Sequence, residues 1–364
     1  MMIDAPEVSQ VAEISATWLS RVLEGAGFDG AEVVSFTTRP VGTGQAAGCF
    51  RILPEYSRPR AGLPRSIVTK FPSDDEASRT SGASAGTYAR EIEFYRSLQS
   101  QLSIRTPRSY LAERDESGGR FALLLEDLAP ADQGDQLIGC DAEFARAAVM
   151  ELVGLHAPSW NNSAMLGSNL VSYTSVPERA RGIMNRIYRV GLPHFMVRCA
   201  DKLEKDEVAL IQRVAECEEL PSEHPRLQAR CLTHNDYRLD NFLFVPSDAV
   251  ATLRVVDWQT YGTGNPMRDV SYFIGGCLLP ELRSCLERDL VREYHALLCT
   301  SGVADYDFDT CWSDYRQASY HGLMNAMAGM VFAKQTERGD RLFTAMAQRH
   351  ARQIIDLGAG EFLL

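Results

Sequence analysis

The spacing of apolar residues divides the chain into a β-rich first part and a longer part with helical periodicity. Residues 8–23 carry apolar side chains three and four positions apart, which predicts an amphipathic helix. Short runs rich in β-branched and aromatic residues, separated by Gly and Pro, then predict a small antiparallel sheet. The five predicted strands are residues 33–41, 48–53, 66–71, 107–113 and 120–125.

A further helix is predicted between the third and fourth strands, over residues 87–98. Residues 78–86, rich in Ser and Gly, predict a loop before it. Glu91 shares the apolar face of this helix with Tyr88 and so faces the sheet. An unpaired buried carboxylate is costly, so we expect a cationic partner, and Lys70 near the end of the third strand is the candidate.

Helical periodicity dominates after residue 128, with one long helix predicted over residues 308–332 and a β-rich interruption at 230–258. These patterns predict an α+β protein of two lobes. The N-lobe would span residues 1–128, with the first helix, the five-stranded sheet and the Glu91 helix. A mostly helical C-lobe would span residues 129–364.

Composition and charge narrow the functional class. The 364 residues carry a net charge of −11 and show no basic stripe, which argues against a nucleic-acid partner. The nine cysteines are odd in number and lack Cys-x-x-Cys spacing, as expected in a reducing compartment. Residues 1–20 lack a signal-peptide pattern, and the apolar run at 270–279 is too short to span a bilayer. We therefore expect a cytoplasmic protein without a membrane segment and leave its oligomeric state open.

The segment from His234 to Asn241 contains the most informative polar motif. It reads His-Asn-Asp-Tyr-Arg-Leu-Asp-Asn, and Asp257 follows a buried apolar run downstream. Transfer of a γ-phosphoryl group needs a carboxylate beside the acceptor hydroxyl and oxygen ligands for Mg²⁺. Asp236, Asn241 and Asp257 supply these groups, so the motif predicts phosphoryl transfer.

A Gly-rich turn between the first two strands contains Gly42, Thr43, Gly44 and Gln45. Its backbone could approach phosphates without obstruction by a Cβ atom, although hairpin turns use Gly for conformational reasons as well. The order of turn, strand lysine, helical glutamate, polar loop and strand-end aspartate matches the parts of kinase-like phosphotransferases.

The segment that follows Asp257 indicates a small acceptor. Only eleven residues separate Asp257 from Asp269, whereas protein kinases place a long peptide-binding segment after the corresponding aspartate. Little room is left for docking a peptide substrate.

These motifs resemble the aminoglycoside and choline phosphotransferase superfamily, which has a protein-kinase-like fold, and within it the ecdysteroid-kinase-like branch. The resemblance rests on the run from His234 to Phe244 and on Val-Asp-Trp-Gln at residues 256–259. Leu-Leu-Glu-Asp-Leu at 124–128 is similar to the hinge of the family. Asn235 stands where the family often has Gly, and Asn tolerates the left-handed backbone angles that such a position requires.

The resemblance implies roles for the polar motif. Asp236 would be the catalytic base that orients or deprotonates the acceptor hydroxyl. Asn241 and Asp257 would bind Mg²⁺. His234 and Asp269 would support the catalytic loop.

The resemblance also implies a nucleotide site and an activity. Lys70, fixed by Glu91, would contact the α- and β-phosphates of ATP, and Glu126 and Leu128 would offer backbone groups to adenine. The chain would then be an ATP- and Mg²⁺-dependent phosphotransferase acting on a hydroxyl of a small molecule. The altered Gly-rich turn and Asn235 keep a non-catalytic nucleotide-binding regulator as an alternative, and a protein kinase is a third, less favoured one.

The acceptor pocket is the least defined part of the sequence. Arg238 and Asp240 either bind substrate or pair with each other. Trp312, Tyr315 and His321 fall on a predicted late helix and either line a substrate pocket or belong to the core.

Overall fold

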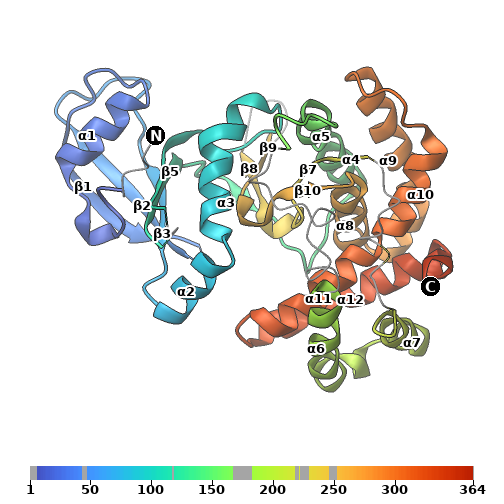
Figure 1. The fold of residues 1–364 in the computed structure, drawn as a ribbon. Coiled ribbons are helices and arrows are strands. Elements are labelled where there is room, and N and C mark those ends of the chain that lie inside the picture. The colour runs from blue at the N-terminus through green and yellow to red at the C-terminus, as the bar shows by residue number, and fades with distance from the viewer. Residues whose placement is uncertain are drawn as a thin grey trace. The chain divides into compact units, whose positions relative to one another are not determined.

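The computed structural model describes residues 6–42, 47–116, 119–166, 183–217, 221, 229–245 and 252–363. The chain forms two compact units (Figure 1). Unit 1 contains Met1–Gln101, Arg105–Asp132 and Leu243–Thr260. Unit 2 contains Leu102–Ile104, Gln133–Phe242 and Tyr261–Leu364. The chain therefore returns to unit 1 after the His234–Asn241 motif, and Asp257 belongs to that unit.

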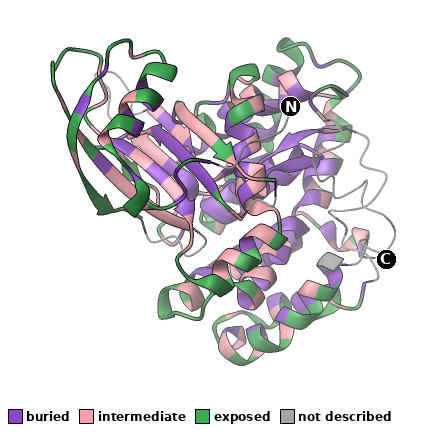
Figure 2. Cartoon of the chain, turned by 60° about the vertical axis from the view of Figure 1, so that its left-hand side comes forward, coloured by how far each residue is buried: buried purple, intermediate pink, exposed green. Residues whose placement is uncertain are grey.

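Unit 1 is built on a five-stranded sheet with the order β1-β2-β3-β5-β4, and its neighbouring strands pair antiparallel. The predicted sheet is thus confirmed, with strand ends shifted by up to three residues. The strands are β1 Val33–Pro40, β2 Ala47–Tyr56, β3 Ile67–Pro72, β4 Ser109–Arg114 and β5 Phe121–Glu126. Most residues of the edge strand β1 are exposed, whereas β5 is almost entirely buried (Figure 2).

One face of this sheet packs on helix α1, Ala16–Gly25. Ser15 caps the helix by accepting a hydrogen bond from the Trp18 N–H at 3.1 Å. The apolar stripe of the helix, with Trp18 and Leu19, joins Ile67 and Phe71 of β3 in one buried cluster. Because side chains alternate along a strand, Lys70 lies on the opposite face of the sheet from Ile67 and Phe71.

Two helices follow β3 in unit 1: α2, Glu76–Ser84, and α3, Thr87–Glu93, which continues as a π-helical turn, η2, over Phe94–Leu98. The prediction of a loop at residues 78–86 is wrong for most of that segment. Asp75 starts α2 as its N-cap, with its side chain accepting from the Ser78 N–H at 2.8 Å. Gly86, with φ of 68°, is the left-handed residue that separates the two helices.

The described residues also form shorter elements in both units. They are the 3₁₀ turns η1 Val11–Glu13, η3 Gln99–Gln101, η4 Ala200–Lys202, η6 Leu239–Asn241, η7 Trp258–Thr260 and η8 Ala359–Phe362, and the strands β6 Asp132–Gln133, β7 Cys231–Thr233, β8 Phe242–Val245, β9 Thr252–Val255 and β10 Gly262–Gly264. Strands β7 and β10 pair antiparallel, with Leu232 opposite Thr263.

Unit 2 is mostly helical, as predicted. Its helices are α4 Ala142–Glu151, α5 Val153–Ser159, α6 Ile183–Arg198, α7 Lys205–Val214, α8 Met267–Cys277, α9 Pro280–Thr300, α10 Phe308–Ala318, α11 Tyr320–Phe332 and α12 Glu337–Asp356. Every residue of α8 is buried, including Arg268 and Asp269. The single helix predicted over residues 308–332 is two helices that meet at Ser319, whose hydroxyl donates to the Arg316 carbonyl at 2.7 Å.

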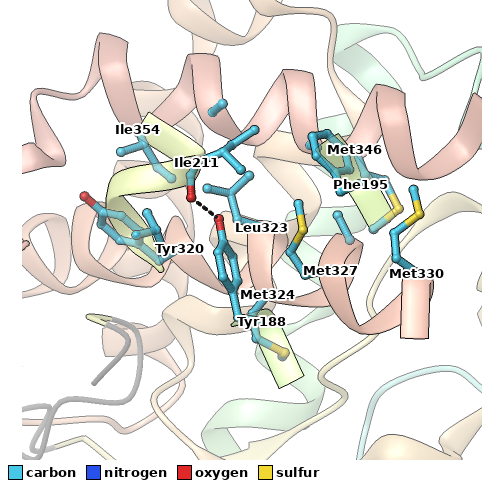
Figure 3. Packing of buried hydrophobic residues seen from close by; sticks show 14 of the residues in the cluster. Tyr188, Phe195, Ile211, Tyr320, Leu323, Met324, Met327, Met330, Met346 and Ile354 are labelled. Carbon is cyan, nitrogen blue, oxygen red and sulfur yellow. Dashed lines mark hydrogen bonds between the residues drawn. The ribbon is translucent and has the colours of Figure 1, made fainter. Parts of the chain in front are cut away.

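An apolar cluster of unit 2 lies where α11 packs against α6 and α12 (Figure 3). Methionine side chains fill much of it, since Met324, Met327 and Met330 of α11 all contribute. The hydroxyl of Tyr188 is paired within the unit, because it donates to the Ile211 carbonyl at 3.0 Å. This cluster anchors α11, which also bears His321 and Asn325.

The helices of the described part of the chain include none with the length and apolar character needed to cross a bilayer.

Candidate functional site

Lys70 and Glu91 form an ion pair inside unit 1. Lys70 Nζ donates to Glu91 Oε1 at 2.6 Å, with the Lys70 side chain 18% exposed and that of Glu91 only 6%. The pairing follows from local structure, because Lys70 projects from the sheet face opposite α1 while Glu91 lies on the buried face of α3. The structure therefore brings together the two residues that the sequence predicted as partners.

Asp257 completes a charged triad with this pair. Its Oδ1 lies 3.4 Å from Lys70 Nζ, and its Oδ2 accepts from the Gln259 amide at 3.2 Å. The backbone of Asp257 has φ of 67°, a left-handed conformation that directs the side chain out of the strand line. One ammonium group thus contacts two carboxylates that are far apart in sequence.

Two contacts fix the segment around Asp257 on α3. The ring of Trp258 stacks on Phe94 with centroids 3.7 Å apart and planes 5° apart, and Arg90 Nε donates to the Gln259 carbonyl at 2.9 Å. The helix that carries Glu91 therefore also holds the residues that follow Asp257. Movement of α3 would displace both carboxylates of the triad.

Each charged group of the triad shifts the pKa of its neighbours. Burial lowers the pKa of Lys70, but the Glu91 and Asp257 carboxylates outweigh that effect and leave its pKa well above the ordinary value. Burial raises the pKa of Glu91, while the nearby ammonium opposes this shift. Lys70 is consequently a permanent cation at neutral pH, suited to contact an anion such as a phosphate.

The segment after β5 contains the residues predicted to face adenine. Glu126 ends β5, and its backbone N–H donates to the Arg108 carbonyl at 2.8 Å. Leu128 is buried. Between them, the Asp127 carboxylate pairs with Arg51 of β2, whose Nη2 donates to Asp127 Oδ1 at 3.0 Å.

The Arg51–Asp127 pair was not predicted. Burial raises the pKa of Asp127, but hydrogen bonds from Arg51 and Ser66 outweigh burial and lower it overall. The Ala129 N–H also donates to Asp127 Oδ1 at 3.1 Å. The segment is thus fixed to β2 through one side chain. The sequence signal that could have indicated this pair was Asp127 itself, a charged residue in the middle of the hinge-like segment.

The Gly-rich turn lies mostly outside the described residues. Gly42 is described and has φ of 78°, where a side chain would be strained. Thr43, Gly44 and Gln45 fall outside the described part of the chain.

The loop that contains Asp236 and Asn241 lies in unit 2. Asn241 Nδ2 donates to the Asp236 carbonyl at 2.8 Å and to Asp236 Oδ2 at 2.9 Å. Because the amide is planar, its oxygen is directed away from Asp236 and is available to a cation. The predicted tight return of Asn241 toward Asp236 is therefore present.

The carboxylate of Asp269 binds the backbone of this loop. Asp269 is fully buried on α8. Its Oδ2 accepts from the His234 N–H at 2.7 Å, and its Oδ1 accepts from the Asn235 N–H at 2.8 Å. His156 Nε2 lies 3.3 Å from Asp269 Oδ2. Burial raises the pKa of Asp269, but His156, His234 and the backbone donors outweigh it and lower the pKa overall.

Asn235 adopts the left-handed conformation that its position requires, with φ of 64°. Its side-chain oxygen accepts from the Thr233 hydroxyl at 3.0 Å. Its carbonyl oxygen lies 3.0 Å from His321 Nε2 and accepts from the Asn325 amide at 3.1 Å. His321 therefore contacts the loop backbone, one residue before Asp236.

Arg238 and Asp240 pair with each other, which was one of the two readings of the sequence. Arg238 Nη1 donates to Asp240 Oδ2 at 2.9 Å, and Arg238 Nε lies 3.0 Å from Asp236 Oδ1. Burial lowers the pKa of Arg238, but Asp236, Tyr272 and Asp240 raise it well above its ordinary value overall. A fixed positive charge thus stands beside the Asp236 carboxylate.

Trp312 and Tyr315 of α10 have partners within the helical unit. Their rings stack with centroids 5.2 Å apart. The Tyr315 hydroxyl donates to Glu287 Oε2 at 3.0 Å and accepts from the Gln353 amide at 3.0 Å. Tyr315 is fully buried. These contacts favour the core reading for Tyr315.

Two residues that contact the loop were missed as site residues. Tyr272 of α8 donates a hydrogen bond from its hydroxyl to Asp236 Oδ1 at 3.0 Å. Asn325 of α11 donates to the Asn235 carbonyl. Neither position had a sequence signal, since Tyr272 belongs to an apolar run and Asn325 lies some 90 residues after the loop.

Comparison with known proteins places these features in a class. The chain resembles a choline kinase structure from Cryptosporidium parvum Iowa II, with a TM-score of 0.53, 11% identity, and coverage of 89% of this chain and 91% of that one. This likeness shows a kinase-like fold. An ADP-bound aminoglycoside phosphotransferase structure also matches, with a TM-score of 0.48, 16% identity, and coverage of 92% and 99%.

The family is shown by a match to the ecdysteroid kinase-like family model over residues 46–301. The chain belongs to that family. A curated relative, acyl-CoA dehydrogenase family member 10 of Mus musculus, is 29% identical over 146 residues, which cover 35% of this chain and only 14% of that protein.

Proposed function

We propose that this protein transfers the γ-phosphoryl group of ATP to a hydroxyl group of a small molecule. The observation that supports this most directly is the triad in unit 1, where the Lys70 ammonium lies 2.6 Å from Glu91 and 3.4 Å from Asp257. The Lys70 ammonium would contact a phosphate, and the partly exposed Asp257 carboxylate beside it is a candidate metal ligand. Family membership supports the same reaction class.

The oxygen donors fit Mg²⁺, which prefers carboxylate, amide and water oxygens. We assign Asn241 and Asp257 as its ligands. The Asn241 amide nitrogen is engaged by Asp236, which leaves the amide oxygen for a cation. Bound Mg²⁺ would neutralise charge on the phosphate oxygens.

The chain's own residues account for the proton and for positioning. Asp236 would accept the proton of the acceptor hydroxyl. The hydroxyl oxygen then bonds to the γ-phosphorus as the bond to the bridging oxygen breaks, and the electron pair leaves with ADP. Lys70 would hold the α- and β-phosphates, with Glu91 fixing the ammonium. Arg238 adds a positive charge beside Asp236.

The short elements that follow Asp257 support a small acceptor molecule. The 3₁₀ turn η7 covers Trp258–Thr260, β10 covers Gly262–Gly264, and α8 begins at Met267. No long segment remains between Asp257 and Asp269 for docking a peptide.

The test is phosphoryl transfer from ATP to a panel of hydroxylated metabolites and antibiotics, with and without Mg²⁺. Asp236→Asn should abolish transfer and keep nucleotide binding, measured as a thermal shift. Asp289→Asn, at an exposed aspartate of α9, is the control and should behave as wild type. Full turnover by Asp236→Asn would refute the assignment of the base. Nucleotide binding that needs no Mg²⁺, together with no transfer, would support a nucleotide-binding regulator instead.

A further inference from the structure

The carboxylate of Asp236 is held from a second element, helix α8. The Tyr272 hydroxyl donates to Asp236 Oδ1 at 3.0 Å, and Tyr272 is only 1% exposed. A buried tyrosine placed on a carboxylate orients it, because the phenol has one hydrogen and few alternative directions in which to donate it.

The two carboxylate oxygens of Asp236 have different surroundings among the described residues. Oδ1 accepts from Tyr272 and has Arg238 Nε at 3.0 Å. Oδ2 accepts from the Asn241 amide at 2.9 Å. A carboxylate offers about four lone-pair directions, two on each oxygen. Oδ1 thus has a hydroxyl donor and the Arg238 guanidinium against it, so Oδ2, with one amide donor, is the oxygen with room for a further hydrogen bond.

Tyr272 is itself fixed by neighbours on α11 and α12. Its ring stacks on His350 with centroids 5.5 Å apart and planes at 14°, and meets His321 edge-on at 5.5 Å. The Asn325 side chain hydrogen-bonds to its hydroxyl. Asn325 also donates to the Asn235 carbonyl at 3.1 Å, so one amide supports both the tyrosine and the loop.

The Tyr272 hydroxyl keeps its proton at neutral pH and can therefore donate to Asp236. Burial raises the pKa of Tyr272 well above its ordinary value, and Asp236 raises it further. Burial lowers the pKa of His321 to about 4 and that of His350 to about 3. At neutral pH the phenol is therefore protonated, and its ring lies against two uncharged imidazoles.

We propose that Tyr272 is a positioning residue that holds Asp236 in the orientation that presents Oδ2 to the acceptor hydroxyl. This rests on the proposed function, in which Asp236 is the base. Tyr272 acts through the carboxylate and does not touch the transferred group. Its effect should fall on the chemical step, since its contacts among the described residues are with Asp236 and with side chains of α11 and α12.

The test is Tyr272→Phe, which removes one oxygen and keeps the ring between the two imidazoles. Loss of orientation at a reacting group typically costs about ten-fold to a hundred-fold in rate. We expect kcat to fall by about that factor and KM for ATP to stay within about two-fold.

Tyr306→Phe is the matched control. Tyr306 is also buried in unit 2, and its hydroxyl donates to Asp314 Oδ2 at the same distance, 3.0 Å. Both variants should lose a similar amount of thermal stability, but only Tyr272→Phe should lose kcat. An equal loss of kcat in both would mean that the effect of Tyr272 is merely structural.

The outcomes separate this inference from the proposed function. Wild-type kcat in Tyr272→Phe, with transfer abolished in Asp236→Asn, would overturn the role of Tyr272 and leave the proposed function standing. A crystal structure of Tyr272→Phe gives a readout that needs no substrate. There, an Asp236 carboxylate that keeps one full-occupancy orientation, unchanged from wild type, would overturn the inference whatever the activity.

Discussion

His321 provides a quantitative prediction about acid stability. It is 3% exposed, its Nε2 lies 3.0 Å from the Asn235 carbonyl, and burial lowers its pKa from the ordinary value of 6.5 to about 4. The nearby Arg268 guanidinium contributes to this lowering of the pKa. In the unfolded chain the same imidazole gains a proton near pH 6.5. Between these two values the unfolded state binds more protons, so acidification favours unfolding.

The magnitude follows from the two pKa values. The stability that this histidine contributes is fully present above pH 6.5 and is lost as the pH falls toward 4. Linkage with these values gives a loss of about 2 kcal/mol between pH 7 and pH 4.5 from this one group. That is a large share of the roughly 5–15 kcal/mol by which domains are usually stable.

The assay is urea denaturation of the wild type and of His321→Gln at pH 7 and pH 4.5. Gln keeps an amide donor for the Asn235 carbonyl and does not titrate, so the variant should lose about 2 kcal/mol less than the wild type on acidification. His194→Gln is the control, because His194 is exposed on α6 and meets solvent in both states. The same pH dependence in His321→Gln and wild type would refute the reasoning.

Three other substitutions test the packing and charge of the site. Lys70→Met should weaken ATP binding by about ten-fold or more, equivalent to ~1.4 kcal/mol of binding free energy, because the phosphate contact is lost. Titration calorimetry measures this, and an unchanged affinity would exclude the contact. Trp258→Ala removes a buried ring stacked at 3.7 Å and should cost about 3–5 kcal/mol of unfolding free energy in urea, whereas a cost below about 1 kcal/mol would contradict the anchoring role. Gly322→Ala places a Cβ 2.2 Å from the His350 ring and should cost at least about 1–3 kcal/mol of unfolding free energy. Gly360→Ala, with nothing within 4 Å of the added Cβ, is the control and should change that free energy by no more than about 0.5 kcal/mol. Equal effects would show that the His350 packing is loose.

Many helices and strands could be predicted because the spacing of apolar residues along a short segment depends only on that segment. The strand that bears Lys70 and the helix that bears Glu91 were predicted from alternation and from helical spacing, and both are present. The segment at residues 78–86 was read wrongly because Ser and Gly favour loops, while Asp75 supplies an N-cap that starts a helix there. The helix predicted over residues 308–332 is interrupted at Ser319, inside a segment whose apolar spacing continues without a Gly or Pro at that position.

The sequence by itself determined the chemical groups and their order: a strand lysine, a helical glutamate, an aspartate and asparagine five residues apart, and a later aspartate. The types and spacing of these residues predicted phosphoryl transfer, because local spacing fixes which groups can share a loop or a helix face.

Only the tertiary structure decided how those groups are held. It joined residues 243–260 to unit 1, so that Asp257 meets Lys70 there. It also brought Tyr272 to Asp236 and Asn325 to the Asn235 carbonyl. Such contacts depend on where whole helices pack, and packing is set by the summed burial of many apolar side chains, which no local motif specifies.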